Sequence, residues 1–167
     1  GYQLTPFTRD HAGEEYLRWF HDSEVCRYNS HARFPLTESD VEQFIQSLAG
    51  KEKIVWAIEH LNDGHVGNVS LQRISLLNQS AELAIIIGVP SHWGSGLGLA
   101  ACREVVRHGF DKLNLRKIHL STVVTNLGMR SIAERLGFKQ EGILRGHVFL
   151  AGKREDLVVY GLLREEF

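Results

Sequence analysis

The feature that most constrains the fold is a cluster of three glycines between an apolar strand and a helix. In the stretch VPSHWGSGLGLAA, Gly94, Gly96 and Gly98 alternate with Ser95 and Leu97. The preceding run AIIIG is continuously apolar, as expected of a strand covered on both faces, and the following run LAACREVVRHGFDKL has helical periodicity. Glycine weakens a helix start, so its use here indicates that a ligand approaches the backbone. Free amides at a helix N-terminus form an anion site, for which a pyrophosphate is a suitable ligand.

The spacing of the glycines argues against two common nucleotide-binding motifs. A Walker-type loop requires a Lys and a Ser or Thr at its end, whereas Leu99 and Ala100 follow Gly98 here. A dinucleotide fingerprint requires G-x-G-x-x-G early in a βαβ unit, whereas this chain has G-x-G-x-G after hairpin signals. On the residues alone, an anion-binding loop and a glycine-rich turn without a ligand both remain open.

The order of the other segments predicts a mixed sheet. Strands are predicted near residues 2–5, 53–60, 65–78, 81–89 and 117–124 and in two long runs around the Ala151–Lys153 turn, and helices over 8–20, 37–50, 99–113 and 126–138. This order, β, α, α, β, β, β, α, β, α, β, β, differs from the alternation of a doubly wound Rossmann sheet. We therefore predict an α+β (mixed α/β) fold and, because no linker or repeat divides the chain, a single domain over residues 1–167.

Composition excludes several classes of partner. The net charge of −1 provides no overall attraction to nucleic acid or to an anionic membrane, so any anion site must be local. No apolar run is long enough to span a membrane and no signal peptide opens the chain, so we expect a cytoplasmic protein. Cys26 and Cys102 form neither a disulfide nor a metal-binding pattern, and we expect no metal.

Two motifs resemble those of a known family. VPSHWGSGLGLAA, followed a helix and a strand later by NLGMRSIAERLGF, resembles the two acetyl-coenzyme A binding motifs of the GNAT acetyltransferase superfamily. Gly96 and Gly98 match the glycines of the first motif, and Asn126 opens the second. Trp93 stands where Gln or Arg is usual, which resembles the branch that acetylates ribosomal-protein N-termini and its amino-sugar-acetylating relatives. The resemblance implies a mostly antiparallel mixed sheet with helices on both faces and with strands that splay apart at the cofactor site.

The same resemblance implies where acetyl-CoA binds. The amides from Gly94 to Leu99 would hold the pyrophosphate, the strand end at 86–88 would pair with the pantetheine amides and polarise the acetyl carbonyl, and Asn126 would bond the pantetheine arm. A core strand for 86–88 and a helix N-cap for Asn126 are the structural alternatives. The full set of expected cofactor-binding residues is Ile86, Ile87, Gly88, Trp93, Gly94, Ser95, Gly96, Leu97, Gly98, Leu99 and Asn126.

Acetyl transfer by direct attack of an amine on the thioester requires a neutral amine. A lysine-like amine has a pKa of roughly 10.4, so a base must remove its proton at neutral pH. Glu82 occupies a place where relatives often carry a catalytic glutamate, and a solvated strand-end acid is its structural alternative. His92 and His119 are further histidines near the site and are more typical of structural roles. The Tyr that many GNAT enzymes use as an acid corresponds to Ala133 here, so that acid is missing.

The acceptor is expected to be a small primary amine. Family members contact it through the loop after the first helix, which here contains Tyr28, Asn29 and His31, and Asp156 on the last strand is a further candidate. A nucleotide-linked amino sugar fits the mixed charge of HDSEVCRYNSHAR better than a polycation does. A protein N-terminal amine, a polyamine and an aminoglycoside remain alternatives, as do a non-catalytic CoA-binding module and an ordinary nucleotide-binding domain. Met129 replaces a Ser that the N-terminal-acetylating branch often carries. A homodimer is a possible assembly.

Overall fold

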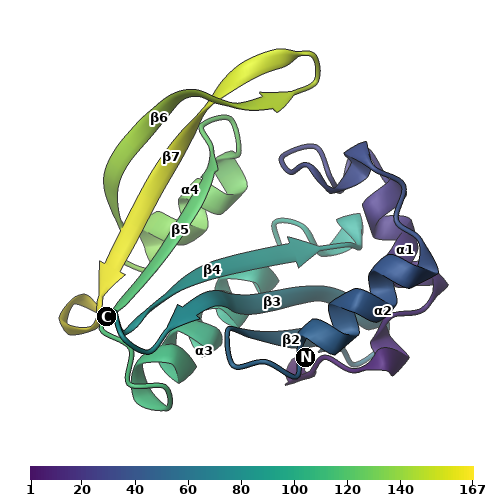
Figure 1. Cartoon of the computed structure of the whole chain (residues 1–167), viewed down its shortest axis with the longest axis horizontal. Coiled ribbons are helices and arrows are strands. Elements are labelled where there is room, and N and C mark those ends of the chain that lie inside the picture. Colours follow the sequence, from purple (N-terminus) through teal and green to yellow (C-terminus); the bar gives the residue numbers. More distant parts are fainter.

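The computed structural model describes residues 1–167 as one sheet with helices on both faces (Figure 1). The strands are β1 (Tyr2–Pro6), β2 (Lys53–His60), β3 (Gly64–Ser75), β4 (Ser80–Ile87), β5 (Lys117–Val123), β6 (Lys139–Leu150) and β7 (Lys153–Leu163). The α-helices are α1 (Glu14–His21), α2 (Glu38–Ser47), α3 (Leu97–Asp111) and α4 (Leu127–Arg135). Short 3₁₀ turns are η1 (Arg9–His11), η2 (His31–Arg33), η3 (Pro90–His92) and η4 (Arg164–Glu166). The predicted order of strands and helices is confirmed.

The sheet has the strand order β1-β2-β3-β4-β5-β7-β6. All neighbouring pairs are antiparallel except β4 and β5, which are parallel. That parallel pairing covers only Ser80–Glu82 against Lys117–His119, after which the two strands separate. The sheet therefore opens into a V between β4 and β5, as Figure 1 shows.

Each face of the sheet has its own apolar cluster. Behind the sheet in Figure 1, α3 packs Val105, Val106 and Phe110 into the larger cluster, which also contains residues of β3, β5 and β7. In front of the sheet, Trp19 and Phe20 of α1 belong to a smaller cluster with residues of β2. The V between β4 and β5 consequently has helices α3 and α4 on one side and the α1 region on the other.

Local signals account for most of the element boundaries. Thr37 caps α2, because its side chain accepts a hydrogen bond from the Asp40 N–H and the Asp40 carboxylate accepts one from the Thr37 N–H. The two-residue loop between β6 and β7 consists of Ala151 at φ 47° and Gly152 at φ 80°, which suits a tight hairpin. These features agree with the turn and cap expected from the sequence.

Two expectations are wrong in detail. Residues 8–20 do not form one helix, because Gly13 adopts an extended conformation between η1 and α1 and acts as the N-cap of α1. The AIIIG run is not covered on both faces, since Ile85–Ile87 are only half-buried. The separation of β5 from β4 removes the neighbour that would have covered one edge of this run.

Candidate functional site

The open edge of β4 is the centre of the candidate site. The Gly88 N–H donates to the Val66 carbonyl at 2.9 Å, so the backbone groups of Gly88 and Ile86 face β3. By strand alternation, Ile85 and Ile87 turn their N–H and C=O groups toward the opening. The Ile87 carbonyl accepts a hydrogen bond from Trp93 Nε1 at 2.9 Å, which fixes the strand end to the glycine loop. Of the three strand-end residues predicted from the sequence, Ile87 has an N–H directed into the V.

The glycine loop presents a set of unpaired amides at the start of α3. Gly94 has φ 72° and Gly96 has φ 88°, a region that residues with a side chain rarely adopt. A Cβ at either position would meet no atom within 4 Å, so the backbone conformation, and not crowding, requires glycine there. The amides that make no hydrogen bond within the chain are those of Gly94, Ser95, Gly96, Gly98 and Leu99. These free N–H groups are the donors that the predicted anion-binding loop requires.

The remaining residues of the loop have structural contacts. Ser95 Oγ donates to the His92 carbonyl at 2.7 Å and accepts from the Leu97 N–H at 3.3 Å. Leu97 itself is buried. A Cβ on Gly98 would lie 3.2 Å from Ile132 Cδ1 and 3.6 Å from Ile85 Cδ1, so this glycine allows α3 to pack closely against α4 and β4.

Asn126 lies at the N-terminus of α4. Its side-chain oxygen accepts a hydrogen bond from the Met129 N–H at 3.1 Å, and its amide group donates to Thr122 Oγ1 at 3.0 Å. The Asn126 side chain is therefore the N-cap of α4 and is held in one orientation. This is the structural role that the sequence left as an alternative, and one amide hydrogen is still free to contact a ligand.

Part of the predicted acceptor loop lies beside the glycine loop. The Arg27 guanidinium stacks over the rings of Trp93 and Tyr28, at 5.0 Å and 4.9 Å from their centroids. Tyr28 is thus placed next to a residue of the predicted cofactor site. Asn29 has a local role, because its side-chain oxygen accepts from the His31 N–H at 2.9 Å.

His31 and Asp156 occupy different parts of the site region. The His31 ring packs edge-on against Phe20, and partial desolvation lowers the pKa of His31 although much of the residue is exposed. Asp156 Oδ1 accepts from the Gly146 N–H at 2.7 Å and so supports the irregular part of β6. Tyr160, which lies on β7 with Asp156, is buried in the core and accepts a hydrogen bond from Arg130.

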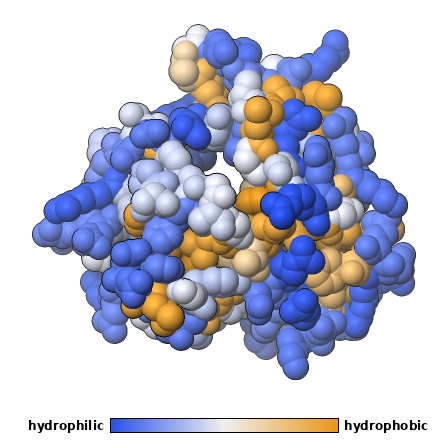
Figure 2. All heavy atoms as spheres, turned by 180° about the vertical axis from the view of Figure 1, so that it is seen from behind, coloured by the Kyte–Doolittle hydropathy of each residue, from blue (hydrophilic) through white to orange (hydrophobic).

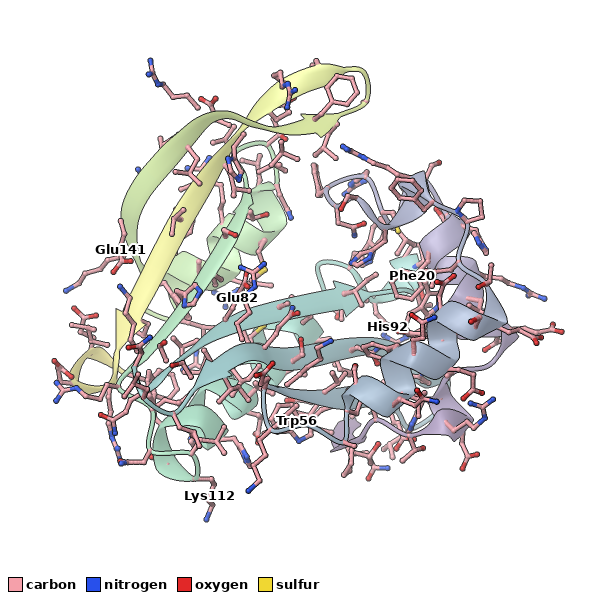
Figure 3. The ribbon with its side chains drawn as sticks, viewed as in Figure 1. Phe20, Trp56, Glu82, His92, Lys112 and Glu141 are labelled. Atoms are coloured by element: carbon pink, nitrogen blue, oxygen red, sulfur yellow. The ribbon has the colours of Figure 1, made fainter.

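Glu82 lies where β4 and β5 begin to part (Figure 3). Its register partner on β5 is His119, and side chains at paired positions of neighbouring strands point to the same face. Glu82 also lies 3.3 Å from the Arg73 guanidinium, and its side chain is 18% exposed. The predicted base is therefore near a histidine and is partly accessible, at the apex of the V.

Several residues around the V were missed by sequence reasoning. A Cβ on Gly88 would lie 1.9 Å from Trp19 Cδ2, so the indole ring of α1 lies directly on the end of β4. The guanidinium groups of Arg33 in η2 and Arg154 in β7 both lie over the ring of Phe149 in β6, at 5.7 Å and 5.6 Å from its centroid. These contacts join segments distant in sequence, and no local pattern predicts them.

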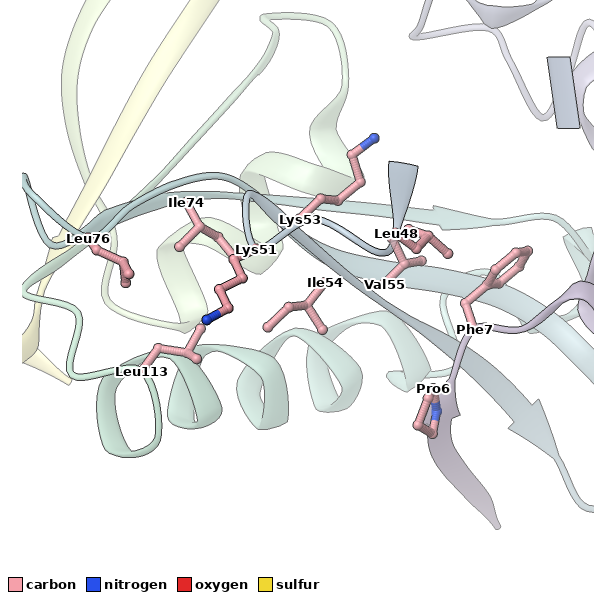
Figure 4. A pocket seen from close by; sticks show the side chains of 11 residues that line it. Pro6, Phe7, Leu48, Lys51, Lys53, Ile54, Val55, Ile74, Leu76 and Leu113 are labelled. Atoms are coloured by element: carbon pink, nitrogen blue, oxygen red, sulfur yellow. The ribbon is translucent and has the colours of Figure 1, made fainter. Parts of the chain in front are cut away.

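A separate cavity of about 410 Å³ lies beside the start of β2, next to the end of β1 (Figure 4). It includes Pro6, Leu48, Lys51, Ile54 and Leu113, and it contains none of the predicted site residues. Seen from behind, the surface of the protein mixes polar and apolar side chains and has a hollow near its middle (Figure 2). No helix of the structure combines the length and the apolar character needed to cross a membrane.

Comparisons with known proteins agree with this geometry. The sequence model of the acetyltransferase (GNAT) domain matches residues 3–139. The "Putative ribosomal N-acetyltransferase YdaF" of Bacillus subtilis (strain 168) is 34% identical over 108 residues, which cover 64% of this chain and 58% of that protein. Spermidine N(1)-acetyltransferase of Vibrio cholerae is 30% identical over 112 residues, which cover 67% of this chain and 64% of that protein. The matched part thus spans less than two thirds of either relative.

A solved structure extends the similarity in fold to the whole chain. The crystal structure of spermidine N-acetyltransferase from Vibrio cholerae in complex with CoA and spermine has a TM-score of 0.88 at 23% identity. The superposition covers 99% of this chain and 96% of that chain. Because the family model matches most of the sequence and the fold agrees throughout, the chain belongs to the GNAT family of acetyl-CoA-dependent N-acetyltransferases.

Proposed function

We propose that this chain binds acetyl-CoA in the V between β4 and β5 and transfers the acetyl group to a primary amine on an anionic small molecule. The observation that carries the cofactor assignment is the set of five unpaired amides in the loop 94–99 at the start of α3, all but that of Leu97. Five such donors and the positive end of the α3 dipole suit a pyrophosphate. The open backbone N–H and C=O groups of Ile85 are then available to the amides of the pantetheine arm.

The Ile87 N–H is the proposed donor to the acetyl carbonyl. Because Trp93 Nε1 already occupies the Ile87 carbonyl, the strand end is held still and its N–H remains available. A fixed donor aimed at a developing oxyanion stabilises the tetrahedral intermediate without reorganisation. The thiol of coenzyme A has a pKa of roughly 8.5, so its thiolate is a good leaving group. The absence of a phenol at Ala133 therefore does not prevent its departure.

Glu82 is the proposed general base. It accepts the proton of the attacking ammonium through a chain of water molecules, because Glu82 lies five residues from Ile87 along β4, roughly 16 Å at the rise of an extended strand. Its carboxylate lies 3.3 Å from the Arg73 guanidinium, which holds the side chain beside the opening of the sheet. His119, its register partner, is within the same group of side chains and offers a second polar contact for the acceptor.

Positive charge around the acceptor region favours an anionic acceptor. Arg33 and Arg154 flank Phe149, and neither has a carboxylate within 4.0 Å. Two unpaired guanidinium groups attract phosphate oxygens and repel a polycation. A nucleotide-linked amino sugar, which has both a diphosphate and a primary amine, meets these requirements better than spermidine does.

Calorimetric titration with CoA tests the cofactor site. Gly96→Ala forces a side chain into a left-handed conformation and re-aims the neighbouring amides, so we expect at least a tenfold loss of CoA affinity. Gly152→Ala is the matched control, because Gly152 also has a positive φ and open space around its Cβ, but lies in the β6–β7 turn. Equal CoA affinity in Gly96→Ala and Gly152→Ala would refute the assignment of the pyrophosphate to this loop.

Turnover assays test the acceptor class. Thiol release is measured with acetyl-CoA and a nucleotide-linked amino sugar, spermidine or a peptide with a free N-terminus. We expect the highest kcat/KM for the nucleotide-linked amine, and a decrease of that preference in Arg33→Gln and Arg154→Gln. Arg18→Gln is the control, because Arg18 is exposed on α1 and pairs with Glu14. A preference for spermidine, or no effect of the two substitutions, contradicts the proposed acceptor and leaves the cofactor site intact.

A further inference from the structure

Three side chains of kinds that bind metals lie close together outside the V. His60 ends β2, Asp63 lies in the turn before β3, and His92 ends η3. His60 Nδ1 lies 2.9 Å from Asp63 Oδ2, and His92 Nε2 lies 3.0 Å from the same oxygen. All three atoms are within 4.8 Å of one another. Segments about 30 residues apart in sequence therefore present two imidazoles and one carboxylate to a common point.

The short distance between His60 and Asp63 lacks the geometry of a hydrogen bond. His60 Nδ1 is fully buried and has no hydrogen-bond partner, although Asp63 Oδ2 is within 2.9 Å. A buried polar atom without a partner is costly, so it requires an explanation. The contact of His92 Nε2 with the same Asp63 oxygen does have hydrogen-bond geometry, so His60 Nδ1 is the unpartnered atom of the group, and an ion held by all three side chains would satisfy it.

The separations also fit the bond lengths of a small divalent ion. Zinc lies about 2.0–2.2 Å from histidine nitrogens and carboxylate oxygens. Two ligand atoms at those lengths, at angles between a right angle and the tetrahedral angle, are about 2.8–3.6 Å apart. The two separations at Asp63 Oδ2 fall within this range.

We propose that His60, Asp63 and His92 form a binding site for a transition-metal dication of the zinc class. Two imidazoles and a carboxylate suit such an ion better than they suit Mg²⁺ or Ca²⁺, which take mainly oxygen ligands. The Asp63 side chain is 52% exposed, whereas those of His60 and His92 are 22% and 12% exposed. An ion can therefore enter from the Asp63 side and complete its coordination with water.

The position of the site indicates a structural consequence. An ion bound here would tie the β2–β3 turn to η3, which leads directly into the glycine loop. The His92 carbonyl accepts the hydrogen bond from Ser95 Oγ, so the metal ligand is one contact away from that loop. The proposal rests on the three side chains alone and is independent of the proposed acetyl transfer.

The test is a titration of the chelator-treated protein with Zn²⁺ by calorimetry and with Co²⁺ by visible absorption. We expect one ion per chain, d–d absorption bands from bound Co²⁺, and a higher Tm in the presence of Zn²⁺, because the ion binds the folded state. Asp63→Asn and His92→Gln should each weaken binding by at least tenfold, since even outer-shell changes cost about 10–100-fold. His147→Gln is the control, because His147 is an exposed histidine on β6.

Circular dichroism establishes that each variant is folded before the titration. Asp63 lies in an exposed turn, so its replacement by Asn keeps the shape of the side chain and spares the core. The absence of saturable binding at one ion per chain would overturn the proposal and leave only a contact among two histidines and an aspartate. Equal metal affinity in Asp63→Asn and His147→Gln would overturn it as well.

Discussion

The contact between Gly88 and Trp19 leads to a sharp prediction about how α1 is joined to the end of β4. In Gly88→Ala, the new Cβ would lie 1.9, 2.1 and 2.3 Å from three atoms of the buried indole ring. Ordinary contacts between carbon atoms are about 3.5–4.0 Å, so the ring must move by roughly 1.5 Å or more. Trp19 is only 6% exposed and packs within the α1 cluster, so that movement disturbs its neighbours too.

Overpacking of this kind costs about 1–3 kcal/mol, and occasionally more. For a chain of this length, that corresponds to a decrease in Tm of about 2–12 °C. The assay is urea unfolding followed by circular dichroism, with the thermal midpoint as a second measurement. Gly142→Ala is the matched control, because a Cβ on Gly142 meets no atom within 4 Å and its φ is not positive.

A double substitution separates the clash from other effects of alanine. In the Trp19→Leu background the ring is gone, so Gly88→Ala should cost less than it does in the wild-type chain, with a coupling of about 0.5–3 kcal/mol. If Gly88→Ala is as stable as Gly142→Ala, or if its cost is the same with and without Trp19, the inferred contact between α1 and β4 is wrong.

The remaining predictions concern catalysis, pH and thiol reactivity. Glu82→Gln should lower kcat by about 10²-fold or more and leave CoA affinity unchanged, because it removes a base and no cofactor contact; stopped-flow turnover checks this, and unchanged kcat contradicts it. Hydrogen bonds from the Thr37 side chain and backbone lower the pKa of Asp40, so Asp40 stabilises the fold at neutral pH, and this contribution is lost as the pH falls through the lowered pKa. The stability difference between the wild-type chain and Asp40→Asn, measured by urea unfolding, should therefore shrink as the pH falls below about 4. Burial raises the pKa of Cys102 to about 12 and also raises the pKa of Cys26, so neither thiol should react with a disulfide reagent in the folded protein, whereas both should react after denaturation.

The elements that the sequence predicts well are those set by neighbouring residues. Thr37 with Asp40, and Ala151 with Gly152, act within a few positions of one another, so the cap and the turn are visible as local patterns. The unpaired amides after Gly94 are equally local, because the φ angles of a short glycine-rich loop determine them. Gly98 shows the limit of this reasoning, since its close contact with Ile132 on α4 depends on tertiary packing.

The features that sequence patterns did not predict depend on long-range geometry. The exposure of Ile85–Ile87 follows from the point at which β5 separates from β4, and the sequence of neither strand indicates where that point is. The contact between Trp19 and Gly88 joins segments nearly 70 residues apart. His60, Asp63 and His92 have no motif spacing, because the hairpin turn and η3 meet only in the folded chain.

The unpaired amides of the glycine loop also give this protein a built-in reporter of occupancy. An amide without an acceptor exchanges its hydrogen with solvent rapidly, whereas a neighbouring amide deep in α3 exchanges slowly. Deuterium uptake by the peptide that contains Gly94–Leu99 should therefore be fast in the free protein and should fall when CoA is added. Peptide-resolved mass spectrometry can thus follow ligand binding at this loop without any label, acceptor or turnover.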